Sequence, residues 1–86
     1  MNWFVKSLET EIRKWLKRAE ETVKNIELID KSRSQLLDNI HAYIKDSHHF
    51  LEKGQLIEAF EAVIWAWSWI EILEELNVLK INHRKY

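Results

Sequence analysis

The residues best suited to metal chemistry in this sequence are its histidines and nearby carboxylates. Asp38 and His41 form an acid-x-x-His pair, and His48 follows His41 by seven residues on the same flank of a predicted helix. Helical di-iron sites combine such pairs from two helices with further carboxylates. The second pair is absent from the sequence, so we predict that His41, His48 and His49 are partly exposed polar residues. We expect no metal site and no cofactor.

The sequence also lacks the residue patterns that support other catalytic mechanisms. It has no cysteine, no serine with a paired base, one glycine, and no convincing carboxylate pair. The segment IELIDKSRSQLLDNI has a faint likeness to the first helix of all-helical chorismate mutases, whose activity needs several buried cations and a polar acid. The predicted core contains no Arg or Lys, and Glu74 is the only acid near the core side of the last helix. We therefore predict that the protein is not an enzyme and has no small-molecule substrate.

Length and composition indicate one small all-α domain, residues 1–86. The chain has 86 residues, no proline and a single glycine, which leaves too little turn chemistry for a β-sandwich. The absence of cysteine fits a reducing compartment. The amino terminus is already charged and amphipathic rather than a secretory signal, and the longest apolar run, Ala62–Ile70, is interrupted by Ser68. These features predict a soluble, cytoplasmic protein that does not associate with membranes.

Apolar periodicity predicts three helices, at about residues 3–27, 32–53 and 55–79, with a short basic tail at 80–86. Gly54 is expected to end the second helix as a left-handed residue, and Asp30 or Ser32 to cap its start. The predicted core stripe of the first helix is Val5, Leu8, Ile12, Trp15, Ala19, Val23 and Ile26. That of the second is Leu36, Leu37, Ile40, Tyr43, Ile44, Ser47, Phe50 and Leu51.

The third helix is predicted to be apolar on two faces. Its first stripe, expected to face the other helices, is Leu56, Ala59, Phe60, Val63, Ala66, Trp67, Ile70 and Leu73. Its second stripe lies on a different face and is Trp65, Trp69, Ile72 and Leu76.

Short connections predict that the three helices form an up-down-up antiparallel bundle, in which the first and third run parallel. The first helix is rich in cations, whereas the segment Gln55–Leu79 has five glutamates and no Lys or Arg. We predict that these opposite charges pair along the seam between the two helices.

The segment Tyr43–Leu79 resembles a family of small, mostly archaeal helical-bundle proteins known as domain of unknown function 357. The expected family core is aromatic–Ala–x–Gly–Trp–Leu–Asp in the last helix, where this chain has Ser68 for glycine and Glu71 for aspartate. The resemblance implies a three-helix bundle and carries no established activity. Its residues here are Tyr43, Asp46, Phe50, the LEKG ending at Gly54, the AFEA at Ala59–Ala62, and the WAWSWIE at Trp65–Glu71.

The segment FLEKGQLIEAFEAVIWAW also resembles one tetratricopeptide unit, because it places a glycine at a helix–helix corner. Such repeats need about three or more stacked copies to bury a core. The chain shows no 34-residue self-similarity, so a simple helical hairpin is the better interpretation.

Our principal functional prediction is a homo-oligomer or protein-partner interface on the second stripe of the third helix. A monomer seldom leaves a contiguous apolar surface in water, and tryptophan is enriched at interface hot spots. The alternative is that Trp3 and Phe4, or the segment Val78–Ile81, cover this stripe within the monomer. The candidate interface residues are Trp65, Trp69, Ile72 and Leu76.

A second functional prediction is a nucleic-acid accessory protein. The net charge of −1 and the sequence pI of 6.4 oppose this interpretation, and Glu20 and Glu21 interrupt the basic residues. A solvated flank with ion pairs is the simpler explanation. The candidate phosphate-binding residues are Arg13, Lys14, Lys17, Arg18, Arg84 and Lys85.

Overall fold

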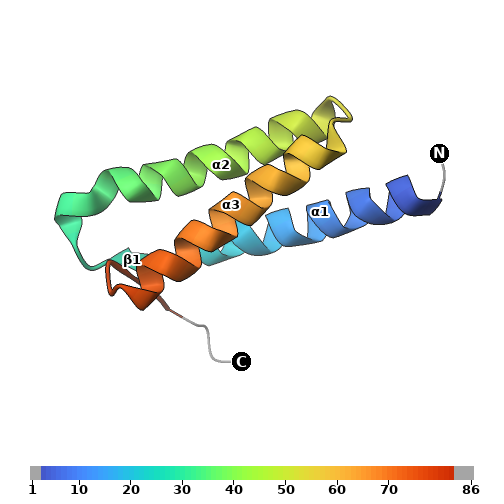
Figure 1. Ribbon diagram of the computed structural model, residues 1–86. Coiled ribbons are helices and arrows are strands. Elements are labelled where there is room, and N and C mark those ends of the chain that lie inside the picture. The colour runs from blue at the N-terminus through green and yellow to red at the C-terminus, as the bar shows by residue number, and fades with distance from the viewer. Residues whose placement is uncertain (1–2, 83–86) are drawn as a thin grey trace.

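The predicted three-helix architecture is confirmed by the computed structural model, which describes residues 3–82. The helices α1, α2 and α3 run up, down and up, and they are followed by a small antiparallel ribbon (Figure 1). The elements are α1 (Trp3–Val23), β1 (Ile26–Leu28), the 3-10 turn η1 (Lys31–Arg33), α2 (Ser34–Glu52), α3 (Leu56–Glu75) and β2 (Leu79–Ile81).

The corner between α2 and α3 depends on Gly54, as the sequence predicts. Gly54 has a φ of 74°, and its N–H donates to the Leu51 carbonyl at 3.1 Å. The N–H of Gln55 donates to the Phe50 carbonyl at 2.9 Å. This pair of hydrogen bonds is a Schellman motif, which satisfies the last carbonyls of α2 and reverses the chain within a few residues.

A second left-handed residue, Asn77, ends α3 earlier than predicted. Asn77 has a φ of 59° and donates to the Glu74 carbonyl at 3.0 Å, while Val78 donates to the Leu73 carbonyl at 2.9 Å. The motif at Gly54 is thus repeated with asparagine, the residue that tolerates this conformation best after glycine. The prediction that the helix continues to residue 79 was wrong because the apolar spacing continues past this stop signal.

The ribbon of β1 and β2 replaces two segments that the sequence indicated as helix or tail. The predicted first helix, to residue 27, ends at Val23, and the predicted tail, from residue 80, begins inside a strand. Ile26 faces Ile81, and Leu28 faces Leu79, in an antiparallel register. The N–H groups of Ile29 and Asp30 both donate to the Val78 carbonyl, at 2.8 and 3.0 Å. A strand of three residues is too short for its apolar pattern to be distinguished from that of a helix end.

Asp30 caps the turn before α2, which is one of the two positions that the sequence indicated. Its carboxylate accepts hydrogen bonds from the Ser32 N–H at 3.1 Å and the Ser32 hydroxyl at 2.6 Å. These bonds, assisted by Arg33, lower the pKa of Asp30 below its ordinary value of 3.8. The cap therefore stabilises the folded chain above that pH and loses its effect as the pH falls through the lowered pKa.

The core lies between the facing sides of the three helices and is closed at one end by the ribbon. The predicted stripe of α2 is confirmed, with Ile40, Ile44, Ser47 and Leu51 buried. In α1 the correction is Leu16, which is 1% exposed, whereas the predicted core residue Trp15 is 37% exposed at the edge. The remaining buried residues are Ile12, Ala19, Ala59, Ala62, Val63, Ala66, Ile70, Leu73, Val78 and Leu79.

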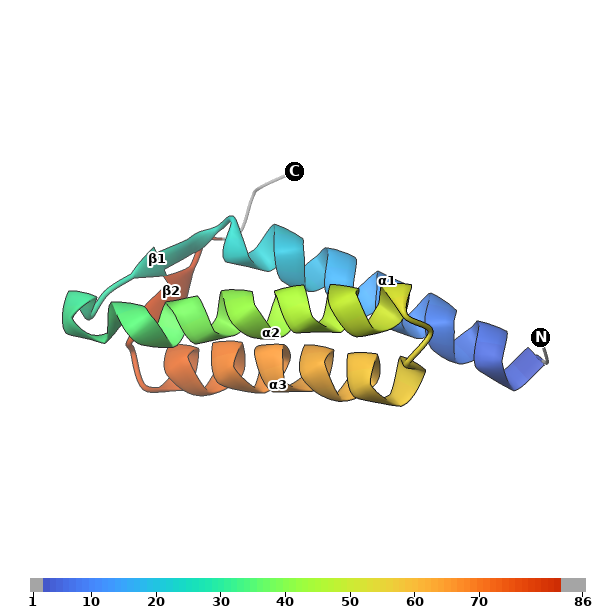
Figure 2. The same cartoon turned by 90° about the horizontal axis from the view of Figure 1, so that it is seen from above.

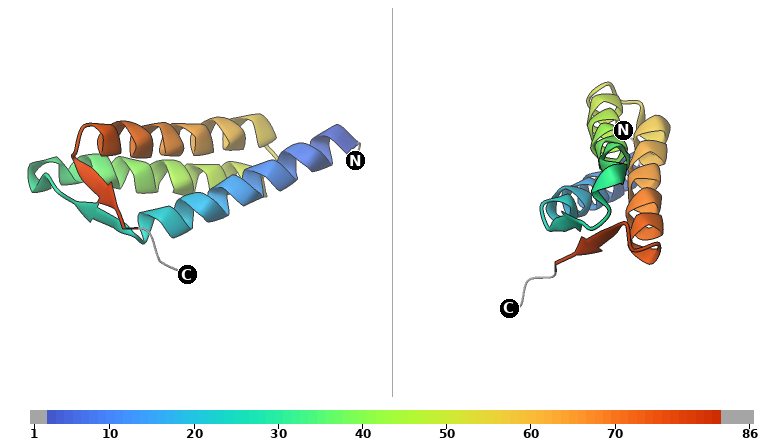
Figure 3. Two further views of the ribbon diagram at one scale, coloured as in Figure 1. Left: turned by 90° about the horizontal axis from the view of Figure 1, so that it is seen from below. Right: turned by 90° about the vertical axis from the view of Figure 1, so that its left-hand side faces the viewer.

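The amino-terminal part of α1 extends past the corner at which α2 turns into α3. Two views at right angles to Figure 1 show α2 and α3 side by side, with α1 crossing them obliquely (Figures 2 and 3). The beginning of α1 therefore has no helix of the hairpin beside it. Trp3 and Phe4, in this segment, are 81% and 67% exposed.

The ribbon generates a stability prediction. Leu79 is 1% exposed and the neighbouring Lys80 is exposed. We expect Leu79→Ala to lower the free energy of unfolding by roughly 2–5 kcal/mol, because a large buried side chain is replaced by a cavity. Lys80→Ala is the matched control, with an expected change within about 0.5 kcal/mol. Urea denaturation followed by circular dichroism measures both, and equal effects would contradict a core role for β2.

The glycine corner generates another prediction. Apart from Gly54 and its two chain neighbours, no heavy atom lies within 4 Å of the position that a Cβ at Gly54 would occupy, so its φ of 74° is the source of strain on substitution. We expect Gly54→Ala to cost about 1–2 kcal/mol of unfolding free energy. Gly54→Asn should cost less, since asparagine already adopts this conformation at position 77. Equal urea midpoints for the two variants would show that backbone conformation does not decide this position.

Candidate protein-contact surface

Large apolar side chains are exposed on α3 outside its buried stripe, and one of them, Trp65, lies on the flank that contacts α2. We call the surface that they make the outward face of α3. Ile57, Trp65 and Leu76 are 66%, 54% and 65% exposed, and the other members are between 37% and 47% exposed. The surface is made by Ile57, Phe60, Ile64, Trp65, Ile72 and Leu76.

Three residues of the predicted stripe are exposed, and the fourth lies at the edge of the core. Trp65, Ile72 and Leu76 are exposed, whereas Trp69 is half-buried and packs against the core. Trp69 therefore supports the edge of this surface from beneath.

Sequence reasoning missed three members of the surface. Ile57 and Ile64 were assigned to neither stripe, although seven residues separate them and two helical turns bring them onto one face. Phe60 was predicted to lie in the core and is 37% exposed. Helical spacing alone was a sufficient signal for Ile57 and Ile64.

The segments proposed as intramolecular covers lie elsewhere. Trp3 and Phe4 are themselves largely exposed. Val78 and Leu79 are buried in the core, and residues 79–81 pair with β1. Within residues 3–82 the outward face of α3 is therefore open to solvent.

Trp65 is held in place by an aromatic contact with α2. Its ring stacks on Tyr43, with 6.2 Å between ring centroids and 19° between ring planes. Such a pair is worth about 0.5–1.5 kcal/mol beyond the area that it buries. The stacked ring has restricted freedom while 54% of the residue remains exposed, so little conformational entropy is lost when a partner contacts it.

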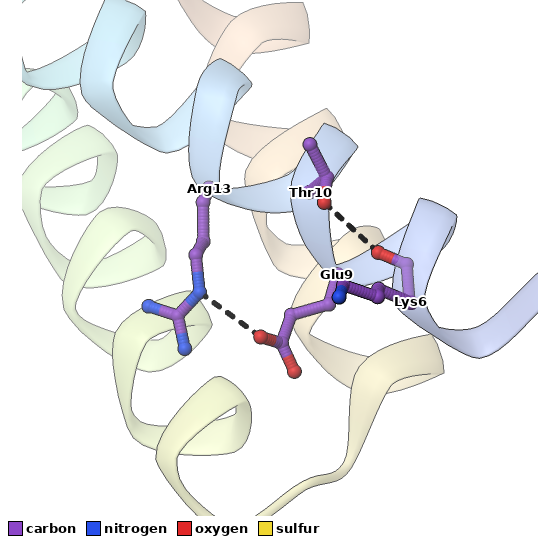
Figure 4. A network of polar contacts seen from close by, with 4 residues as sticks. All are labelled: Lys6, Glu9, Thr10 and Arg13. Atoms are coloured by element: carbon purple, nitrogen blue, oxygen red, sulfur yellow. Dashed lines mark hydrogen bonds and ion pairs between the residues drawn. The ribbon is translucent and has the colours of Figure 1, made fainter. Parts of the chain in front are cut away.

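The predicted ion pairs between α1 and α3 do not form. Arg13 lies 3.3 Å from Glu9, and Lys14 lies 2.9 Å from Glu11, so both cations pair within α1 (Figure 4 shows the first pair). None of the ion pairs found among residues 3–82 joins α1 to α3. Residues three or four apart on one helix meet more readily than residues on separate helices. The glutamates of α3 consequently keep their charge facing solvent.

The cations of α1 surround a partly exposed tryptophan. Above the Trp15 ring lie the Lys14 ammonium, 5.7 Å from its centroid, and the Arg18 guanidinium, at 4.9 Å. Trp67 contacts the same ring edge-on at 6.0 Å, and its Nε1 donates to the Trp15 carbonyl at 3.2 Å. This cluster ties α1 to α3 and orients two of the predicted phosphate-binding residues. Arg84 and Lys85 lie outside the described residues.

The histidines among residues 3–82 do not gather into a metal-binding cluster. Asp38, His41 and His49 are exposed, and the Nε2 of His48 lies 3.1 Å from the carboxylate of Glu20 on α1. Among residues 3–82, no group of three or more potential ligands lies close enough to hold a metal ion. His48 is thus a contact between α1 and α2.

A shallow hollow of about 310 Å³ lies on the amino-terminal part of α1. Its walls come from a single helix, so it is an indentation rather than an enclosed cavity. It is lined by Trp3, Lys6, Ser7, Thr10 and Glu11.

Across the described residues, no helix has both the length and the apolar character that a bilayer crossing needs.

The fold defines a small protein built as a three-helix bundle. Residues 13–79 match the model of the family described as protein of unknown function (DUF357), and the chain belongs to this family. The resemblance inferred from residues 43–79 is therefore confirmed and extends into α1.

A solved relative supports the same fold. The chain is similar to the crystal structure of protein AF1782 from Archaeoglobus fulgidus, itself assigned to DUF357. The two are 47% identical, with a TM-score of 0.83, and the match covers 92% of this chain and 99% of that one. No functionally curated protein matches the chain.

Proposed function

We propose that this protein is an interaction or self-association module that binds through the outward face of α3. The observation that carries this proposal is the exposure of six large apolar side chains on one helix, outside its buried stripe. Contiguous apolar surfaces of this kind mark contact sites in proteins that are otherwise covered by polar residues. The proposed function includes no catalysis, cofactor or small-molecule substrate.

The composition of the surface supports a protein partner. Trp65 is a large, partly rigid aromatic residue, which is the type most enriched among hot spots of binding energy. Ile72 and Leu76 continue the apolar surface beside it along α3. Glu61, Glu71 and Glu75 are exposed on the same helix, so acidic side chains lie beside the apolar ones. Their charge disfavours partners that are themselves acidic.

The size of the surface limits what α3 can do alone. A 20-residue helix is about 30 Å long and 10 Å wide, so one face presents only a few hundred Å². A stable interface of standard size buries about 800 Å² on each partner. A tight complex therefore needs α3 together with another element of the bundle.

Nucleic-acid binding remains a second candidate because Trp15 is exposed between Lys14 and Arg18. Aromatic rings among cations are typical of surfaces that bind single-stranded nucleic acids. Two observations make it the weaker candidate. Lys14 is already paired with Glu11, and the chain has a net charge of −1.

The first test is the solution mass over a dilution series, measured by light scattering. We expect the wild-type chain to exceed its monomer mass of 10.5 kDa, or to capture a protein partner. Trp65→Ser/Ile72→Ser should abolish that association, because it removes two of the six exposed apolar side chains, one of them the tryptophan. The circular dichroism of this variant should remain helical, because both side chains are about half exposed in the folded chain.

The control for this test is Ile29→Ser, which removes an isolated apolar side chain that is 51% exposed and lies outside α3. This control should leave the mass and partner capture unchanged. Unchanged mass and unchanged capture in the Trp65→Ser/Ile72→Ser variant would refute the proposed function.

The nucleic-acid candidate has its own test. Lys17→Ala/Arg18→Ala should weaken retention of single-stranded RNA, and salt at about 0.5 M should release it, if phosphate contacts dominate. An apolar protein contact should weaken only modestly over the same range of salt. RNA retention that resists salt, or survives the double substitution, would contradict this candidate.

A further inference from the structure

We infer that this protein forms a two-fold dimer in which the hairpin of α2 and α3 packs, antiparallel and face to face, on the same hairpin of a second copy. The contact surface is the side of the hairpin that faces away from α1, which we call the hairpin face. This inference rests on the proposed function, because it names the partner and adds α2 to the surface. The hairpin face consists of Leu36, Tyr43 and Phe50 of α2 and Trp65, Trp69, Ile72 and Leu76 of α3.

Contacts within the monomer place the hairpin face opposite α1. On α3, Trp67 contacts Trp15 of α1, whereas Trp65 stacks on Tyr43 of α2. On α2, it is His48 that contacts α1. At 100° per residue, Trp65 lies about 160° around α3 from Trp67. Tyr43 lies about 140° around α2 from His48. The stacked rings therefore lie on the side of the hairpin that α1 does not cover.

The hairpin face is apolar and open to solvent within residues 3–82. Trp65, Ile72 and Leu76 are 54%, 47% and 65% exposed. The other four members are half-buried, so each packs against the core and keeps part of its side chain in solvent. The surface of α3 is too small for a tight complex by itself, and α2 supplies the second element that such a complex needs.

The area of the hairpin face suits a second hairpin better than a single helix. Each helix is about 30 Å long and 10 Å wide, and packed helices lie about 8–10 Å apart, so a face of two helices measures roughly 600 Å². Two copies would together bury roughly 1,200 Å², which is the lower end of specific, stable interfaces. A single partner helix would cover only about half of the face.

The stacked rings of Tyr43 and Trp65 give the hairpin face a shape that favours a flat partner. Their centroids are 6.2 Å apart and their planes differ by 19°, so they bridge the seam between α2 and α3. A single helix would seat its side chains in the furrow between the two helices. The ring pair fills that furrow at its middle, whereas the same ring pair on a second copy can pack directly against it.

The position of the ring pair suits a two-fold axis. Tyr43 is nine residues from each end of α2, and Trp65 is nine and ten residues from the ends of α3. An axis through this point and perpendicular to the helices overlaps both helices over their full length. The contact is then isologous, since each copy contributes the same surface.

Charge favours this axis over one that runs along the helices. The acidic residues beside the hairpin face, Asp46, Glu58 and Glu61, all lie between its middle and the α2–α3 corner. An axis along the helices would bring the two acidic ends together, which is unfavourable. The perpendicular axis places them at opposite ends of the dimer. The remaining glutamates of α3 lie about 80° or more around the helix from Trp65.

Two matched pairs of side chains on α3 test which flank makes the contact. Ile72 and Leu76, on the hairpin face, are 47% and 65% exposed, while Ile64 and Ile57, on the other flank, are 45% and 66% exposed. We expect Ile72→Ser/Leu76→Ser to raise the dimer dissociation constant at least about tenfold, measured by sedimentation equilibrium. Ile57→Ser/Ile64→Ser should change it by less than about twofold. Both variants should keep the wild-type circular dichroism, because the substituted side chains are similarly exposed.

A charge added to α2 tests the antiparallel arrangement. About the central Tyr43, Asn39 of one copy faces residues 46–47 of the other, so Asn39→Lys places an ammonium near Asp46. We expect the dissociation constant to fall roughly two- to fivefold at low salt, and the gain to vanish at about 0.5 M salt. Ala42→Lys is the matched control, since it adds the same charge at an exposed residue about 100° around α2 from Tyr43. Equal dissociation constants for the two variants would overturn the inference.

A comparison of the two serine variants separates the inference from the proposed function. If Ile57→Ser/Ile64→Ser weakens association as much as Ile72→Ser/Leu76→Ser, or more, the contact is not confined to the hairpin face. The inference then fails, while the proposed function stands because the contact still uses the outward face of α3.

The wild-type mass supplies the remaining outcomes. A chain that is monomeric at every concentration, or a dimer that neither serine variant weakens, overturns the inference. The proposed function then depends on capture of another protein. It stands if Trp65→Ser/Ile72→Ser abolishes that capture, and it fails if the variant does not.

Discussion

The close packing of α2 against α3 is the constraint on which the rest of this structure depends. Near the corner between these helices, the hydroxyl of Ser47 donates to the Ala59 carbonyl at 2.7 Å, and both residues are 0% exposed. A buried hydroxyl needs such an acceptor, and the small side chain of Ala59 lets the two backbones come close enough to provide it. The Schellman motif at Gly54 places the helices in register for this contact.

The choice of small residues on the inner side of α3 determines what its outer side presents. Three of the six buried residues of α3 are Ala59, Ala62 and Ala66, and the aromatic side chains of this helix lie outside its buried stripe. Some of them find partners there: Trp67 contacts Trp15 of α1, and Trp65 stacks on Tyr43 of α2. The others remain in contact with solvent. The same helix therefore packs tightly against α2 on one side and exposes apolar side chains on another.

Charge is distributed over the same framework. Arg13 and Lys14 pair with glutamates one turn away, and Arg18 lies over Trp15. In the described part of the chain, no ion pair joins the acidic residues of α3 to α1. The monomer therefore presents an acidic apolar surface on one side and a cationic aromatic segment on another. Local pairs form readily along a helix because residues three or four apart are already neighbours on its surface.

The sequence by itself determined the features that depend on local spacing. Apolar residues at intervals of three and four predicted three helices, and the single glycine predicted the corner at Gly54. The motif around residues 43–79 predicted the family. The same spacing placed Trp65, Ile72 and Leu76 on a different side of α3 from the core, because side chains repeat around a helix every 3.6 residues.

Only the tertiary structure decided the features that depend on residues far apart in the chain. The ribbon exists because residues 26–28 pair with residues 79–81. Neither segment is long enough for its own sequence to predict a strand. Leu16 is core and Trp15 lies at its edge because α1 crosses the hairpin obliquely, which shifts its buried stripe. Whether the outward face of α3 was covered also depended on where Val78 and Leu79 go. They enter the core, because Asn77 turns the chain toward β1.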